Sequence, residues 1–193
     1  MNLDRERAVV LSLDMQAGVV SVYVKDAATV ERAADVLRVA RRAGVAVVHV
    51  KVAFRPGVPE ASPRNTFLSA VKASPPHQRF FQGESGAIHP SLSPDAGDLV
   101  VTKSRVSAFA GTDLDLLLRA QEIHTLILFG IATSGAVLST ALHAADADYR
   151  VVVVKDCCAD LDEAAHACLV EKILPQRATV MSASELVQAL VSS

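Results

Sequence analysis

The sequence predicts an α/β fold of three layers, Rossmann-like, in which helices cover both faces of a six-stranded parallel sheet. Short, β-branched apolar runs alternate along the chain with longer segments whose apolar residues recur at helical spacing. Aliphatic residues dominate, aromatic residues make up only 4%, and tryptophan is absent. That bias suits strands that are buried on both faces.

The first half of the chain supplies two strands and one long helix. Residues 8–13 (AVVLSL) and 45–52 (VAVVHVKV) are short, β-branched runs typical of strands. Between them, apolar residues at helical spacing follow Thr29, which we expect to cap the helix, and Gly44 ends it. Residues 55–97 hold seven of the eight prolines and show little periodicity. We therefore expect a functional loop there, or short helices that the pattern does not resolve.

The second half of the chain alternates strands with helices. Because this alternation produces parallel strands, ligands are expected beyond the carboxyl ends of the strands, and the residues that follow each strand become candidate site residues. The expected strands are residues 98–102, 125–129, 150–154 and 178–181, and the expected helices are residues 113–120, 134–147, 163–173 and a last one from Ser184.

Composition excludes several classes of protein. The 193 residues, taken as one domain over 1–193, carry 19 basic and 21 acidic side chains, which does not indicate a nucleic-acid partner. No apolar run reaches the ~18 residues of a membrane span, and charged N-terminal residues argue against a signal peptide. Three cysteines, two of them adjacent, do not form a disulfide pattern. We expect a cytoplasmic protein that contacts no membrane.

Three features stand at strand ends. Asp14 follows the first strand, Lys103 follows the third, and a small-residue turn (GIATSGA, 130–136) follows the fourth. Taken singly, they are explained as a helix cap, a solvated strand end and a tight connection. Together they predict a buried ion pair beside a helix N-terminus whose N–H groups can hold an oxyanion. The turn matches neither phosphate-binding glycine motif.

With these motifs the sequence resembles the isochorismatase-like (cysteine hydrolase) superfamily over residues 7–181. The resemblance implies a six-stranded parallel sheet, an Asp–Lys–Cys triad and a non-proline cis peptide, by position Ile131–Ala132. In amidase members of the family the Cys forms a thioester, the Asp takes its proton and the Lys favours the ionised state. The matching segments are LDMQ (13–16), GESG (83–86) leading to IHP, KSRVSAF (103–109), GIAT (130–133) and DCCAD (156–160).

The sequence departs from this family at the nucleophile. The family position, six residues after the turn glycine, is Ala136, whose side chain cannot attack a carbonyl. Cys157, Cys158 and Cys168 stand elsewhere, and we expect them to be small buried packing residues. Three explanations stay open: a Cys-less hydrolase like the true isochorismatases, a Cys-to-Ala variant of an amidase, or a ligand-binding protein without catalysis.

In the first explanation Asp14 is the general acid for hydrolysis of a vinyl ether, and Lys103 is its electrostatic partner. An ammonium lowers a carboxyl pKa whereas burial raises it, and the sequence does not decide between them. The substrate is a small molecule, and we expect no cofactor and no metal, since the six histidines lack ligand spacing. The resemblance further implies a homo-oligomer, a dimer or tetramer. Expected substrate-binding residues are Gln16, Phe54, Arg55, Phe109, Ile131, Ala132 and Thr133.

Overall fold

The computed structural model of this protein describes residues 3–192, and it confirms the predicted α/β fold class. Met1, Asn2 and Ser193, which the predicted domain includes, lie outside these residues. One sheet of six strands, all paired in parallel, has the order β3-β2-β1-β4-β5-β6. Its strands are β1 (Ala8–Leu13), β2 (Ala46–Val52), β3 (Leu99–Lys103), β4 (Thr125–Gly130), β5 (Arg150–Val154) and β6 (Thr179–Met181).

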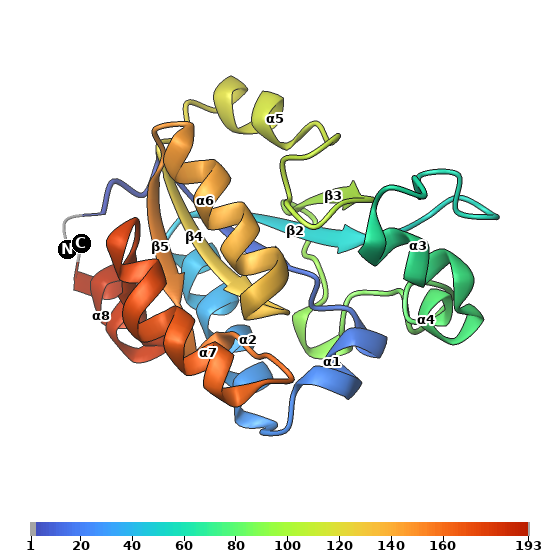
Figure 1. The fold of residues 1–193 in the computed structure, drawn as a ribbon. Helices are drawn as coiled ribbons and strands as arrows, with labels where there is room; N and C mark the ends of the chain where they lie inside the picture. The colour runs from blue at the N-terminus through green and yellow to red at the C-terminus, as the bar shows by residue number, and fades with distance from the viewer. Residues whose placement is uncertain (1–2, 193) are drawn as a thin grey trace.

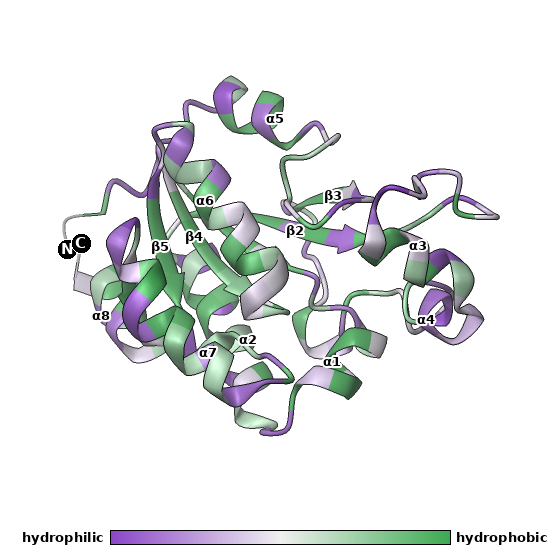
Figure 2. Ribbon diagram, viewed as in Figure 1, coloured by the Kyte–Doolittle hydropathy of each residue, from purple (hydrophilic) through white to green (hydrophobic). Residues whose placement is uncertain are grey.

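The centre of the sheet is buried on both faces. Every residue of β1 and β4 is buried, and Figure 2 shows β4 and β5 as largely apolar ribbons between helices. This is the burial that an aliphatic composition with few aromatic residues predicts. The register pairs Leu13 with Gly130, so β1 and β4 end at the same level.

Helices lie on both faces of this sheet. In Figure 1, α6 lies in front of β4 and β5 and α2 lies behind them, where α8 packs against α2. Gly44, with φ +76°, follows Ala43, the C-cap of α2, and ends the helix as expected. The layers are formed by α2 (Ala28–Arg42), α5 (Leu114–Ala120), α6 (Leu138–Asp146), α7 (Glu163–Cys168) and α8 (Ala183–Ser192).

The predicted cap of α2 is wrong. Helix α2 begins at Ala28, so Thr29 lies inside its first turn and accepts a hydrogen bond from the Arg32 guanidinium. The side chain that receives the first helical N–H is Asp26, whose Oδ1 accepts from the N–H of Ala28 at 3.0 Å. An aspartate can close this turn as well as a threonine can, and the apolar spacing alone did not distinguish them.

The proline-rich stretch 55–97 contains short helices, one of its two expected forms. These are α3 (Thr66–Ala73), which begins at the Asn65 cap, and α4 (Pro75–Arg79), which begins at a proline pair. Helix α1 (Ala17–Tyr23) was not predicted, because it has seven residues and no capping side chain. Both ends of the stretch are fixed beside the strand ends, since Ala53 N–H donates to the carbonyl of Lys103 and His89 N–H to that of Met15.

Candidate active site

Asp14 and Lys103 form a buried ion pair at the carboxyl end of the sheet. Lys103 Nζ lies 2.8 Å from Asp14 Oδ2, and the two side chains are 0% and 11% exposed. Strand β2 separates β3 from β1, so the long side chain of Lys103 reaches past the end of β2 to Asp14. Lys103 also donates to the carbonyl of Val106 in the loop that follows β3. The two residues that the sequence selected are therefore in direct contact.

The carboxyl group of Asp14 is poised to carry a proton. Burial raises the pKa of Asp14 from 3.8 to about 6, although the Coulomb attraction and the hydrogen bond of Lys103 lower it. Asp14 Oδ1 is buried and has no hydrogen-bond partner among the described residues. Asp14 also has φ +54°, which turns the chain away from β1 directly after the strand. Burial is thus the larger of the two opposing effects that the sequence left undecided.

The small-residue turn lies next to this pair. Ile131 N–H donates to the carbonyl of Leu13 at 3.0 Å, which joins the start of the turn to the residue before Asp14. The peptide Ile131–Ala132 is cis, as the resemblance implied. The turn continues as a π-helical segment, Thr133–Val137, so the helix expected from residue 134 is regular only from Leu138. Ala136 is 3% exposed within that segment.

The connection between β5 and α7 holds the turn from its other side. Ser134 N–H donates to Asp160 Oδ2 at 2.7 Å, and Thr133 N–H donates to the carbonyl of Ala159 at 3.0 Å. Thr133 Oγ1 lies 2.8 Å from His166 Nδ1 in α7. The sequence analysis did not single out His166, and no local motif marks it, since 33 positions separate it from Thr133.

The side chain of Gln16 is hydrogen-bonded within the protein. It is 0% exposed, its Nε2 donates to the carbonyls of Val52 and Gly86, and its Oε1 accepts from Val52 N–H. Both the nitrogen and the oxygen of the Gln16 side-chain amide are used by these bonds, which join Val52, at the end of β2, to Gly86 in the 55–97 stretch. We therefore assign Gln16 to the scaffold of the site instead of to substrate contact.

Phe54 and Arg55 follow β2 and lie near the Asp14–Lys103 pair. Phe109 lies elsewhere, against α6 and Tyr149. Phe54 packs edge-on against Phe81 with ring centroids 5.5 Å apart, and Arg55 is exposed and pairs with Glu60 at 2.7 Å. Phe109 stacks on His143 at 4.4 Å and lies near Tyr149, which precedes β5 at the amino end of the sheet. Phe109 therefore packs as a core residue.

The cysteines differ in exposure. Cys157 and Cys158 are buried as expected, whereas Cys168, at the end of α7, is exposed, so the expectation of burial is wrong for it. Burial raises the pKa of the Cys157 thiol far above its usual range and that of Cys158 to about 12. Cys158 Sγ donates to the carbonyl of Val154. Both buried thiols therefore stay protonated at neutral pH.

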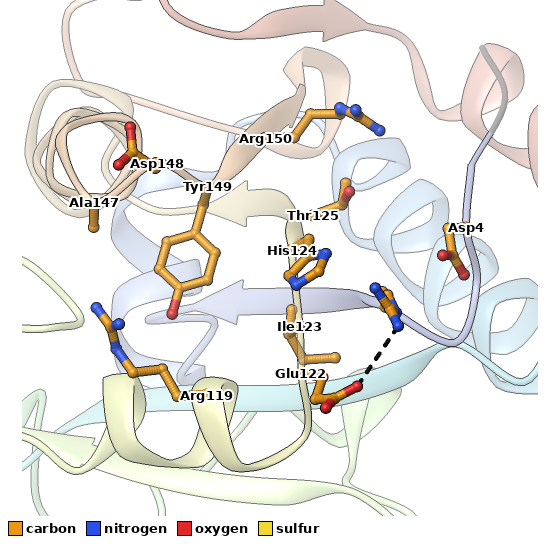
Figure 3. A pocket seen from close by; sticks show the side chains of 11 residues that line it. Asp4, Arg119, Glu122, Ile123, His124, Thr125, Ala147, Asp148, Tyr149 and Arg150 are labelled. Atoms are coloured by element: carbon orange, nitrogen blue, oxygen red, sulfur yellow. Dashed lines mark ion pairs between the residues drawn. The ribbon is translucent and has the colours of Figure 1, made fainter.

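A pocket of about 840 Å³ lies at the opposite end of the sheet (Figure 3). Thr125 and Arg150, which begin β4 and β5, line it together with surface side chains such as Arg119 and Tyr149. An Arg7–Glu122 pair at 3.7 Å crosses one side. We place the candidate active site at the ion pair instead, because parallel sheets bind ligands at their carboxyl ends and the perturbed carboxyl group is there.

Within residues 3–192, no group of three or more His, Cys, Asp or Glu side chains is arranged to hold a metal ion. None of the helices there is both long enough and apolar enough to cross a membrane.

Comparison with known proteins points to one family. The isochorismatase domain model matches residues 8–185. A maleamate amidohydrolase from Pseudomonas putida is 30% identical over 164 residues, covering 84% of this chain and 75% of that protein. A ureidoacrylate amidohydrolase from Methylorubrum extorquens is 34% identical over 137 residues, covering 66% of this chain and 55% of that protein. The structure of an isochorismatase family protein from Burkholderia thailandensis superposes with a TM-score of 0.85 at 31% identity, covering 96% of each chain.

Proposed function

Because this chain belongs to the isochorismatase family, whose named relatives are hydrolases, we propose that it hydrolyses a small molecule with Asp14 as proton donor and without a covalent cysteine intermediate. The observation that carries the proposal is the buried Asp14–Lys103 pair, 2.8 Å apart, in which the pKa of Asp14 is raised to about 6. A carboxylic acid with that pKa gives and takes protons near neutral pH.

The side chain at the family's nucleophile position supports a route without a thioester. Position 136 is alanine, and the two cysteines one strand away, Cys157 and Cys158, are buried and protonated. Cys168 is exposed but lies at the C-terminal end of α7, whereas Asp160 of the β5–α7 connection and His166 of α7 hold the turn. A nucleophile must lie within bonding reach of the atom that it attacks, and the side chain at the family's nucleophile position is not a thiol.

The proposed reaction is the hydrolysis of a vinyl ether. Asp14, protonated, transfers its proton to the terminal carbon of the enol ether, and the ether oxygen stabilises the resulting oxocarbenium ion. Water adds to the cationic carbon and returns a proton to the Asp14 carboxylate. The hemiketal then breaks its carbon–oxygen bond to give a ketone and an alcohol. The Coulomb attraction and the hydrogen bond of Lys103 keep Asp14 from becoming too weak an acid.

Substrate contacts in this proposal come from residues around the pair. Ile131 and Ala132 precede the π-helical turn beside Asp14, and Phe54 and Arg55 follow β2. Arg55 is the exposed cation among them, and a guanidinium binds a carboxylate through two parallel hydrogen bonds. We propose that Arg55 exchanges Glu60 for a substrate carboxylate.

A second candidate is an amidohydrolase whose catalytic cysteine has been replaced by alanine. It is favoured by the named activities of the relatives, maleamate and ureidoacrylate amidohydrolase, and by alanine at position 136. In that case Ala136→Cys restores a thiol beside Asp14, and the variant hydrolyses an amide that the parent protein binds without turnover. A ligand-binding protein without catalysis is the remaining outcome.

The test compares four proteins on small vinyl ethers and on amides that include maleamate and ureidoacrylate. These are the parent, a cysteine-free variant (Cys157→Ala/Cys158→Ala/Cys168→Ala), Asp14→Asn, and the control Asp113→Asn, which changes a carboxylate without a side-chain capping bond. We expect vinyl ether turnover in the parent, the cysteine-free variant and the control, and a loss of about 10³-fold in Asp14→Asn. An inactive but folded cysteine-free variant, or an active Asp14→Asn, would contradict the proposal. A fifth protein, Ala136→Cys, is tested on the same amides, and amide turnover gained only in this variant selects the second candidate.

A further inference from the structure

The hydroxyl of Thr133 stands at the centre of the contacts that hold the turn. Thr133 is fully buried, and its Oγ1 lies 3.2 Å from the carbonyl oxygen of Ala159 and 2.8 Å from His166 Nδ1. Thr133 begins the π-helical segment that contains Ala136, and it directly follows Ala132. Any change in how Thr133 is held therefore acts on the turn that Ile131 joins to Leu13, the residue before Asp14.

The two contacts of the Thr133 hydroxyl decide which role His166 Nδ1 takes in its hydrogen bond. A hydroxyl has one proton, and a carbonyl oxygen can only accept. Both contacts of Thr133 Oγ1 are hydrogen bonds at once only when His166 Nδ1 carries a proton and donates to Oγ1, while Thr133 donates to Ala159. If Nδ1 lacks the proton, the Thr133 hydroxyl donates to the imidazole instead. The carbonyl of Ala159 then keeps the N–H of Thr133 as a donor and loses the hydroxyl.

His166 is itself fixed from two sides. Helix α7, which carries it, is capped by Asp162, whose Oδ1 accepts from the N–H groups of Ala164 and Ala165 at 2.9 and 3.0 Å. The neighbouring Glu163 pairs with Lys25, in the segment after α1, at 2.7 Å. The imidazole thus approaches Thr133 from a helix whose first turn is held by Asp162 and by the Glu163–Lys25 pair.

We propose that His166 is a positioning residue of the active site, which holds Thr133 by an Nδ1–H···Oγ1 hydrogen bond and so sets the place of Ala132 and Ala136 relative to Asp14. This inference rests on the proposed function, since it takes the turn to be part of the site. His166 does not touch the reacting atoms in this account. It acts through Thr133 alone.

Two measurements test the proposal in a Cys168→Ser background, which removes the exposed thiol. The first is hydrogen exchange of the Thr133 and Ser134 amides by NMR. The second is the rate of iodoacetamide alkylation of the thiol introduced by Ala136→Cys. Each is made with His166 intact, with His166→Ala and with His166→Asn, whose side-chain N–H takes about the position of Nδ1–H. His124→Ala, at an exposed histidine of the opposite sheet end, is the control.

We expect His166→Ala to speed exchange at Thr133 and Ser134 by about tenfold and to slow alkylation by a similar factor, whereas His166→Asn and the control stay within about threefold of the parent. Unchanged exchange and alkylation in His166→Ala would overturn the proposal. So would an Asn variant that behaves like the Ala variant, because the histidine would then act by bulk alone. A thiol at position 136 that is inert even with His166 intact counts against the second candidate, the amidohydrolase, while amide exchange still decides the role of His166.

Discussion

At Asp14, burial and the neighbouring Lys103 shift the pKa of the carboxyl group in opposite directions. The resulting pKa determines whether the group can donate a proton. Burial disfavours the carboxylate and the ammonium of Lys103 favours it, and the pKa of Asp14 settles at about 6. With that pKa, about a tenth of the carboxyl groups carry a proton at pH 7. Without Lys103, burial alone would leave a weaker acid, and without burial Asp14 would remain ionised.

This balance predicts the effect of Lys103→Met, a substitution that keeps the apolar stem and removes the charge. Burial then acts on Asp14 without opposition, so the pKa of Asp14 rises by about 1–3 units. The acid form persists to higher pH, and the pH at which kcat/KM begins to fall moves upward by the same amount. The measurement is the pH profile of kcat/KM for the parent and the variant. A midpoint that stays in place or moves down would show that Lys103 does not act on Asp14.

Sequence reasoning reached some of these residues and missed others for identifiable reasons. Asp14 and Lys103 were predictable because Asp14 directly follows β1 and Lys103 is the last residue of β3, and parallel strands bring such residues to one edge. The direction of the pKa shift was not predictable, since it depends on how completely Asp14 is buried. Gln16 was predicted as a ligand-binding residue, but its hydrogen bonds to Val52 and Gly86 depend on segments that are distant in sequence.

Among the elements, the connection from β4 into α6 determines the shape of the site. Gly130 ends β4 with φ +141°, and a Cβ at this position would collide with the carbonyl oxygen of Leu13. Only glycine lets β4 approach β1 so closely at the level where Asp14 begins. The glycine that marked the turn in the sequence is therefore needed for packing between strands as well as for the turn.

We predict that Gly130→Ala destabilises the protein by about 3 kcal/mol or more, because it combines a strained φ with a backbone collision. The control is Gly97→Ala, where an added Cβ meets nothing within 4 Å, and which we expect to change stability by less than about 1 kcal/mol. Urea unfolding of both variants measures the difference. Equal stabilities would contradict this account of the β1–β4 contact.

Elements that are long and have a regular apolar pattern were predicted more accurately than short ones. The six strands and the long helix α2 were predicted within a few residues because their apolar patterns are continuous. Helix α1 and the helices of 55–97 are five to eight residues long, and their positions depend on contacts such as the one between Gln16 and Gly86. The π-helical start of the 134–147 segment is set by Thr133 and Ser134 binding the β5–α7 connection, which no local pattern encodes.

Across the whole molecule, a second buried titratable group links stability to pH. His49, on β2, is 1% exposed, and its Nε2 lies 3.2 Å from Asp98 Oδ2, which also binds Arg41 of α2. Burial lowers the pKa of His49 below its usual 6.5, although Asp98 opposes this shift. The folded protein thus holds His49 neutral at a pH where the unfolded chain protonates it. This contribution to stability is complete above pH 6.5 and declines as the pH falls below 6.5.

His49→Gln is predicted to flatten the pH dependence of stability between about pH 5 and 7, by up to about 1.4 kcal/mol per pH unit. Asp14 has the opposite sign, because its raised pKa makes the folded state gain protons, and hence stability, as the pH falls from about 6. Subtracting the variant from the parent cancels the contribution of Asp14. Urea unfolding at several pH values measures that difference, and a difference that does not vary with pH would contradict the role of His49.

The central claim is that a buried Asp14 carries a proton near neutral pH, and it is tested most directly by a ¹³C NMR titration of the Asp14 carboxyl group in the folded protein. Assignment comes from the signal that disappears in Asp14→Asn. The account predicts a midpoint near pH 6, above the ordinary value of 3.8, with Lys103 in place. A midpoint at or below 3.8 would leave Asp14 ionised at neutral pH and contradict its role as the proton donor.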